Sequence, residues 1–167
     1  TWYPTDRALK GSKLDQPGVI AAGFTEAKAE EIKEFLRPNM ISLRACEQIL
    51  LEGVTFQNSP AWNVHPLLCK HLTVENITVK NPWFAQNGDG IDIDRCQDVR
   101  ITNCHFETAD DCISLKSCAA TSQYGLVDNV IINNCFFKST SGAITLGTES
   151  VGDISNVIIS NCIVRDS

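Results

Sequence analysis

The stretch VRITNCHF (99–106) has apolar residues at alternate positions and an asparagine near its centre. Alternation with a period of two is typical of a β-strand, because successive side chains point to opposite faces. Related phrases occur five times along the chain: LLEGVTF (50–56), LTVENITV (72–79), VRITNCHF (99–106), VIINNCFF (130–137) and VIISNCIV (157–164). The central residues of consecutive copies are 23, 27, 31 and 27 residues apart: Gly53, Asn76, Asn103, Asn134 and Asn161. A repeat this short leaves no room for a crossover helix, so it predicts parallel strands stacked into a solenoid, a parallel β-helix.

A second phrase lies between these copies and sets the expected register. Its five members are ISLRAC (41–46), NVHPLLC (63–69), GIDIDRC (90–96), CISLKSC (112–118) and GAITLGTE (142–149). Alignment on the terminal cysteines stacks Ile91 on Ile113 and Ile93 on Leu115. Residues at one register in adjacent coils lie about 4.8 Å apart. Residues at the same position in two successive copies are therefore predicted to be neighbours in space.

Three carboxylates are predicted to meet in this register. Asp89 and Asp111 precede their stacked isoleucines by the same two residues, and Asp110 is adjacent to Asp111. Like charges this close cannot all ionise freely, so we expect at least one carboxyl with a raised pKa. A carboxylic acid beside carboxylates that can activate water is the minimal apparatus for breaking a glycosidic bond.

Other interpretations of these acidic bends remain open at this point. Aspartates are common in turns because their side chains hydrogen-bond to their own backbone. Clustered acidic turns also bind calcium through oxygen ligands. The alignment of two separate acidic turns in adjacent coils favours catalysis. A second polar column, on the face opposite the isoleucines, is expected to contain His65, Asp92, Ser114 and Thr145, with Lys116 beside Asp94.

The motifs NGDGIDID (87–94) and ADDCISLKS (109–117) resemble those of the polygalacturonases of glycoside hydrolase family 28, and the segment 40–66 resembles the exo-acting and bacterial-type members. The resemblance extends over roughly residues 38–167. It implies a right-handed parallel β-helix that hydrolyses galacturonan with inversion. It also implies Asp110 as the general acid, with Asp89 and Asp111 positioning and deprotonating the water. No cofactor and no metal are expected.

Residues expected to contact the substrate follow from the same columns and the same resemblance. They are Asn87, Asp92, His65, Trp62, Lys116 and Ser141. Ser141 stands where the family usually has the histidine of a Gly-His-Gly motif, and the chain stops before the position of the family's Arg-x-Lys motif. Two alternatives therefore stay open: a catalytically impaired carbohydrate-binding β-helix and a calcium-dependent lyase of the pectate lyase type. The lyase ranks lower because no basic proton abstractor is evident.

Composition limits the classes of partner. The 167 residues are 43% hydrophobic with a net charge of −6, which disfavours nucleic acid, and no apolar run is long enough to span a membrane. We expect a monomer that binds a pectin-like polysaccharide and is secreted or periplasmic.

Two regions complete the predicted organisation. Residues 1–38 are expected to form an irregular segment with one short helix at 25–36, and residues 39–167 a β-helix truncated at its C-terminal end, a fragment of a longer enzyme. The eight cysteines recur at fixed registers, which favours mostly free thiols in the stacked core over a disulfide framework.

Overall fold

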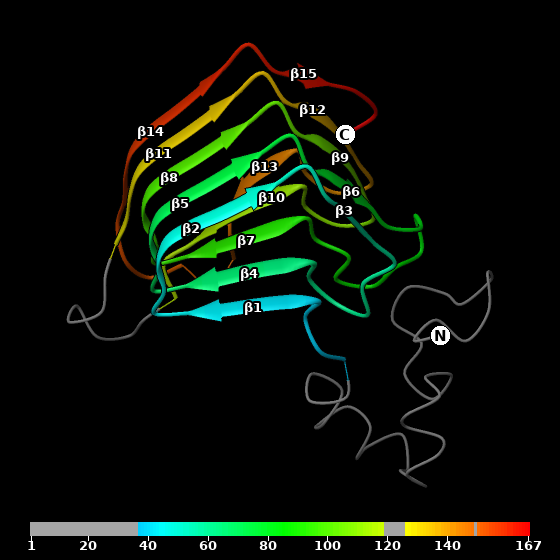
Figure 1. Ribbon diagram of the computed structural model, residues 1–167. Helices are drawn as coiled ribbons and strands as arrows, with labels where there is room; N and C mark the ends of the chain where they lie inside the picture. Colours follow the sequence, from blue (N-terminus) through cyan, green and yellow to red (C-terminus); the bar gives the residue numbers. More distant parts are fainter. Residues whose placement is uncertain (1–36, 119–125, 149) are drawn as a thin grey trace, which may run out of the picture.

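The computed structural model describes residues 37–118, 126–148 and 150–167, and within them the chain winds into five successive triplets of strands. Each triplet contributes one strand to each of three parallel sheets, so the strands stack along one axis (Figure 1). The helix expected at 25–36 lies outside the described residues, and the division at residue 38 stays a prediction. Among the described residues, no helix has the length and apolarity that crossing a bilayer requires.

The first sheet, here sheet A, carries the acidic phrases. Its strands in spatial order are β1 (Ile41–Arg44), β4 (Val64–Leu67), β7 (Ile91–Asp94), β10 (Ile113–Lys116) and β13 (Ile144–Leu146). The observed register pairs Ile91 with Ile113 and Ile113 with Ile144. The prediction from cysteine spacing is therefore confirmed.

The other two sheets carry the asparagine-centred phrase, which bends where one sheet gives way to the next. Sheet B contains β2 (Glu47–Glu52), β5 (Lys70–Glu75), β8 (Gln97–Thr102), β11 (Val127–Asn133) and β14 (Ile154–Ser160). Sheet C contains β3 (Thr55–Gln57), β6 (Thr78–Lys80), β9 (His105–Thr108), β12 (Phe136–Ser139) and β15 (Ile163–Val164).

The asparagines at the bend between sheets B and C take a left-handed backbone conformation, with φ of 58° at Asn103 and 52° at Asn134. Asparagine tolerates this conformation better than most residues. The Asn134 side chain donates a hydrogen bond of 2.8 Å to the Asn103 side chain one coil away. The amides of neighbouring coils therefore stack at this pair, which explains why the asparagine recurs in the repeat.

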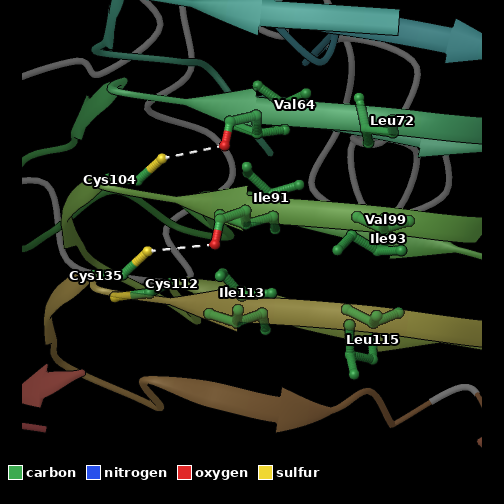
Figure 2. Close-up of a cluster of buried hydrophobic side chains, with 14 of the residues drawn as sticks. Val64, Leu72, Ile91, Ile93, Val99, Cys104, Cys112, Ile113, Leu115 and Cys135 are labelled. Atoms are coloured by element: carbon green, nitrogen blue, oxygen red, sulfur yellow. Dashed lines mark hydrogen bonds between the residues drawn. The ribbon is translucent and has the colours of Figure 1, made fainter. Parts of the chain in front are cut away.

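The core lies between the three sheets and consists of inward-pointing residues in columns. Val64, Ile91 and Ile113 follow one another along the axis and are fully buried (Figure 2). The rings of Phe106 and Phe137 stack with centroids 5.5 Å apart. Truncating a buried phenylalanine in such a core costs about 3 to 5 kcal/mol, so these columns fix the register on which the site depends.

Cysteines extend the same columns as small buried side chains. None of the eight cysteines, which all lie within the described residues, forms a disulfide, and five of them are buried. The thiol of Cys104 donates to the carbonyl of Val74 at 3.7 Å, and that of Cys135 to the carbonyl of Ile101 at 3.8 Å (Figure 2). Each sulfur therefore bonds to the backbone of the preceding coil.

Candidate active site

The acidic bends open into a hollow of about 350 Å³ beside sheet A. Its lining residues are Trp62, Asn87, Asp89, Asp110, Asp111, Lys116, Ser141, Thr145, Leu146, Gly147 and Thr148. They come from four successive coils, and each lies in a strand of sheet A or in the segments next to it: β4, β7, β10 or β13. The stacking of short segments far apart in sequence therefore builds the hollow.

The first acidic bend (residues 86–90) precedes β7 and is held by amide side chains. The Nδ2 atom of Asn63 donates to the carbonyl of Asp89 at 2.8 Å, and that of Asn81 donates to the carbonyl of Gly88 at 2.9 Å. A glycine is required at position 90, because a Cβ there would collide with the carbonyl oxygen of Cys112. These contacts hold Asp89 close against the neighbouring coil.

The second acidic bend (residues 108–112) precedes β10 and is held by hydroxyl groups. The carbonyl of Asp110 accepts hydrogen bonds from Thr108 at 2.5 Å and from Ser139 at 2.6 Å. The hydroxyl of Thr145, on the next coil, donates to Oδ2 of Asp111 at 2.6 Å. The side chain of Asp111 therefore has a fixed direction toward its neighbours.

The three carboxylates of these bends form one cluster. One oxygen from each of Asp89, Asp110 and Asp111 lies within 4.8 Å of the others. Such a cluster can share a proton between its members or hold a divalent cation. Among the described residues, these three aspartates form the group of acidic, histidine or cysteine side chains that is close enough together to hold such an ion.

The pKa of Asp89 is raised to about 7. Burial is the main cause, since only 4% of the residue is exposed, and the charges of Asp110 and Asp111 add to it while Lys116 opposes it. Oδ1 of Asp89 has no hydrogen-bond partner within the described residues, so little compensates the loss of water. The expectation of a raised carboxyl pKa is met at Asp89.

A buried aspartate and a buried lysine lie next to each other near the cluster. Asp92 is fully buried, and its Oδ1 lies 3.5 Å from Nζ of Lys116, which sits 4.6 Å from the centroid of the Trp62 ring. Burial, together with the charge of Asp89, raises the pKa of Asp92. The register pairs the backbone of Lys116 with Asp94 as predicted, yet its ammonium group approaches Asp92 instead. The Lys116 side chain is thereby placed at the hollow rather than at the strand end.

His65 occupies a separate position behind Trp62. The two rings meet edge to face with centroids 4.9 Å apart, and Nε2 of His65 lies 3.8 Å from Oδ2 of Asp94. Burial would raise the pKa of Asp94, but the nearby His65 ring and the hydrogen bond from Nε of Arg95 at 2.9 Å lower it on balance. Asp94 is therefore a paired carboxylate outside the cluster.

The hollow thus includes seven of the nine predicted site residues. Asp92 and His65 do not line it. Asp92 contacts the ammonium group of Lys116, and His65 packs against the ring of Trp62, so each contacts a residue that lines the hollow. The sequence pattern places Thr145 in the polar column but not among the predicted site residues, although Thr145 lines the hollow and bonds to Asp111. The signal for Thr145 was its register with Ser114 and Asp92.

A larger hollow, of about 660 Å³, lies at the bend between sheets B and C. Stacked asparagines and two glutamates, Glu52 and Glu75, line it. Its polar side chains bond from coil to coil: Asn134 donates to Asn103 at 2.8 Å, and Asn103 donates to Glu75 at 3.4 Å. The three clustered carboxylates line the smaller hollow beside sheet A, which is therefore the candidate active site.

Fold and site together define a class: a parallel β-helix with clustered carboxylates in a hollow beside one of its sheets. The sequence profile described as glycosyl hydrolases family 28 matches residues 7–167, so the chain belongs to that family. The family resemblance noted in the motifs is thereby confirmed.

Individual relatives agree. The chain is 33% identical over 125 residues to a probable polygalacturonase of Vitis vinifera, covering 71% of this chain and 25% of the relative. It is 27% identical over 147 residues to an exo-poly-alpha-D-galacturonosidase of Dickeya chrysanthemi, covering 83% of this chain and 24% of the relative. The chain spans about a quarter of the length of these curated relatives.

Solved structures show the same fold. A hyperthermoactive exopolygalacturonase from Thermotoga maritima superposes with a TM-score of 0.73 at 26% identity, over 96% of this chain and 40% of that one. A family 28 exopolygalacturonase from Yersinia enterocolitica superposes with a TM-score of 0.76 at 22% identity, over 87% of this chain and 25% of that one. The β-helical architecture is therefore that of known family members.

Proposed function

We propose that this chain carries the catalytic carboxylates of a glycoside hydrolase that cleaves pectic galacturonan or a related uronic-acid polysaccharide. The observation that carries the proposal is the convergence of Asp89, Asp110 and Asp111 within 4.8 Å from two bends one coil apart. Membership of family 28 supports the reaction class.

The proposed roles follow the family motifs. Asp110 donates a proton to the glycosidic oxygen as the bond from that oxygen to the anomeric carbon breaks. Asp89 and Asp111 orient a water molecule and accept its proton as it attacks the same carbon from the opposite face, which inverts the configuration. The hydrogen bond from Thr145 fixes the direction of the Asp111 carboxyl group, as a base that must face the water requires.

The proton needed for this reaction is supplied by the cluster as a unit. Interacting carboxyls release protons in shared steps, so the cluster retains one proton near neutrality when one member has a pKa of about 7. Burial places that proton on Asp89, whereas the family motif assigns the donor role to Asp110. A proton has only a short distance to move between them, since their oxygens lie within 4.8 Å.

A uronic-acid substrate requires local donors in a protein of net charge −6. Lys116 supplies a positive charge at the hollow, held by Asp92 and by the face of Trp62. We propose that Lys116 attracts a substrate carboxylate and that Asn87, Trp62 and Ser141 contact the sugar. We also propose that the protein acts as a monomer outside the cytoplasm, where polymeric pectin is found.

The test is product analysis with polygalacturonate and with rhamnogalacturonan, using the chain in its longest natural form. Hydrolysis yields new reducing ends without an unsaturated product, and Asp110→Asn is expected to abolish it. Asp153→Asn, at an exposed aspartate outside the hollow, is the matched control. An unsaturated product would show that the protein is a lyase and not a hydrolase. Binding without cleavage would show that it is a carbohydrate-binding module.

A further inference from the structure

Arg37 lies just before β1 and is buried, with 4% of the residue exposed. Its Nη1 atom donates to the carbonyl of Gln86 at 2.7 Å and to the carbonyl of Pro60 at 3.3 Å. Its Nη2 atom donates to Oδ1 of Asn87 at 3.0 Å. One side chain from the first coil therefore bonds to two bends that border the hollow.

The chemistry of this contact fixes the orientation of the Asn87 amide. A guanidinium group has only donors, so the atom of Asn87 that faces it must be the carbonyl oxygen. The NH₂ group then points away from Arg37. Asn87 lines the hollow and has a left-handed backbone with φ of 52°, so the conformation of both main chain and side chain is defined.

From these contacts we infer that Arg37 is a positioning residue for Asn87: it orients the carboxamide so that the NH₂ group is offered to a substrate oxygen. The inference rests on the proposed function of the hollow. The three clustered carboxylates are acceptors when ionised, whereas the hydroxyl and carboxylate oxygens of a uronic acid need donors. A rotated amide would present one more acceptor to the substrate.

Arginine suits this role better than lysine. Its planar fork reaches the oxygens of Pro60, Gln86 and Asn87 at the same time, whereas the ammonium of lysine is a single point of charge. The contact to Pro60 also joins the segment that leads into Trp62 to the segment that carries Asn87. Loss of Arg37 should therefore weaken substrate binding more than it slows the chemical step.

The experiment is a double-mutant cycle on the chain in its longest natural form, with Arg37→Ala, Asn87→Ala and the double variant. The readouts are KM and kcat for the release of reducing ends from oligogalacturonates, with the melting temperature measured alongside. Arg37→Ala is expected to raise KM about tenfold, the loss of one positioned donor, with a smaller change in kcat. In the Asn87→Ala background it should add less than about twofold, since the residue that it positions is already gone. Arg100→Ala, at an exposed arginine on β8, is the control and should match the wild type.

Asn87→Asp separates positioning from simple structural support and leaves Arg37 in place. The carboxylate keeps the bond to Arg37 and so preserves the bend, but it offers an acceptor to the hollow. KM is therefore expected to rise at least as much as in Asn87→Ala, with the melting temperature unchanged.

Two results would overturn the inference alone: a wild-type KM in Asn87→Asp, or an effect of Arg37→Ala that is equally large with and without Asn87. If Arg37→Ala does not fold, the Asn87→Asp result decides. A wild-type protein that releases no reducing ends would overturn the proposed function, and this inference with it.

Discussion

The two acidic bends lie one coil apart and present the same side chain, yet they hold it differently. The first acidic bend is fastened by an arginine and two asparagines, and its Asp89 is 4% exposed. The second is fastened by hydroxyl groups of threonine and serine, and its aspartates are half-buried. Stacking brings the bends together, but the side chains around each bend decide how much water reaches its carboxylate.

This difference separates the electrostatic behaviour of chemically identical groups. Burial raises the pKa of Asp89 to about 7, whereas Asp111 is half-buried and a hydroxyl donor fixes the direction of its carboxyl group. An acid and a base in one site need carboxyl groups with different pKa values. Two similar bends held by different hydrogen bonds, with different burial, are one way to obtain this difference.

The largest expected effect concerns which bend supplies the proton. Both Asp110→Asn and Asp89→Asn are expected to lower cleavage of galacturonan by about 10²-fold to 10⁴-fold, the usual contribution of a general acid or base. An aryl galacturonide, whose phenolate leaves without protonation, should restore activity to Asp110→Asn but not to Asp89→Asn. Initial rates on the two substrates measure this.

Equal rescue of both variants by the aryl substrate would contradict the assignment of roles. Rescue of Asp89→Asn alone would reverse it and make the buried bend the proton donor. Asp153→Asn should resemble the wild type on both substrates.

The next effect is the dependence of stability on pH. Asp89 titrates near 3.8 when unfolded and near 7 when folded, so the unfolded chain releases its proton first as the pH rises. The stabilisation is complete below the unfolded pKa and is lost between about pH 4 and pH 7, by up to about 4 kcal/mol for a shift of roughly three units. Urea unfolding of wild type and Asp89→Asn near pH 4 and pH 8 measures it.

Asp89→Asn cannot ionise and should lose less stability over this range than the wild type. Asp153→Asn should lose as much as the wild type. Parallel curves for wild type and Asp89→Asn would mean that the first bend does not desolvate its carboxylate.

A smaller effect is expected at the second bend. Thr145→Val keeps the shape of the side chain but removes the donor to Asp111, so kcat should fall about tenfold, as for one hydrogen bond to a charged group. Ser155→Ala, which removes a similar hydroxyl-to-aspartate bond on sheet B, is the control and should leave kcat unchanged. An unchanged kcat in Thr145→Val would show that Asp111 needs no orienting donor.

The smallest expected effect is on stability, from removing one of the hydrogen-bonding side chains that hold each bend. Asn81 bonds to Ser59 and Gly88 at the first bend, and Ser139 bonds to Asp110 and Ser141 at the second. Asn81→Ala and Ser139→Ala are each expected to lower the free energy of unfolding by about 1 kcal/mol. The backbone N–H of Gly90 donates to the carbonyl of Asp111 between the bends, but these side-chain bonds of Asn81 and Ser139 have no partner residue in common. The double variant should therefore show the sum, measured by urea unfolding. A strongly non-additive double variant would mean that the bends move as one unit.

Much of the fold could be predicted because the repeat gives the register directly. The stacking of Ile91 on Ile113, and hence of Asp89 near Asp111, followed from phrases that begin and end alike. A raised carboxyl pKa followed from the proximity of like charges. Its location on Asp89 did not, because burial depends on side chains from other coils.

Contacts made outside the repeat could not be predicted. Arg37 precedes the first phrase, so no register relates it to Asn87. The long side chain of Lys116 also departs from its backbone partner and reaches Asp92 rather than Asp94. Register predicts where Cα atoms lie, but a flexible side chain with several rotatable bonds selects its partner by local charge and space.

The repeats differ in length, yet every pair of neighbouring strands stays aligned. The asparagines of the copies centred at residues 103 and 134 are 31 residues apart and those centred at 76 and 103 are 27 apart, and β8 nevertheless pairs in register with both β5 and β11. Extra residues are therefore accommodated between strands, where they leave the carboxylates in place. A single residue inserted within a strand would instead turn its buried side outward. Loops around this hollow could thus be lengthened or exchanged, by evolution or by grafting, to change which polymer enters without rebuilding the acid cluster.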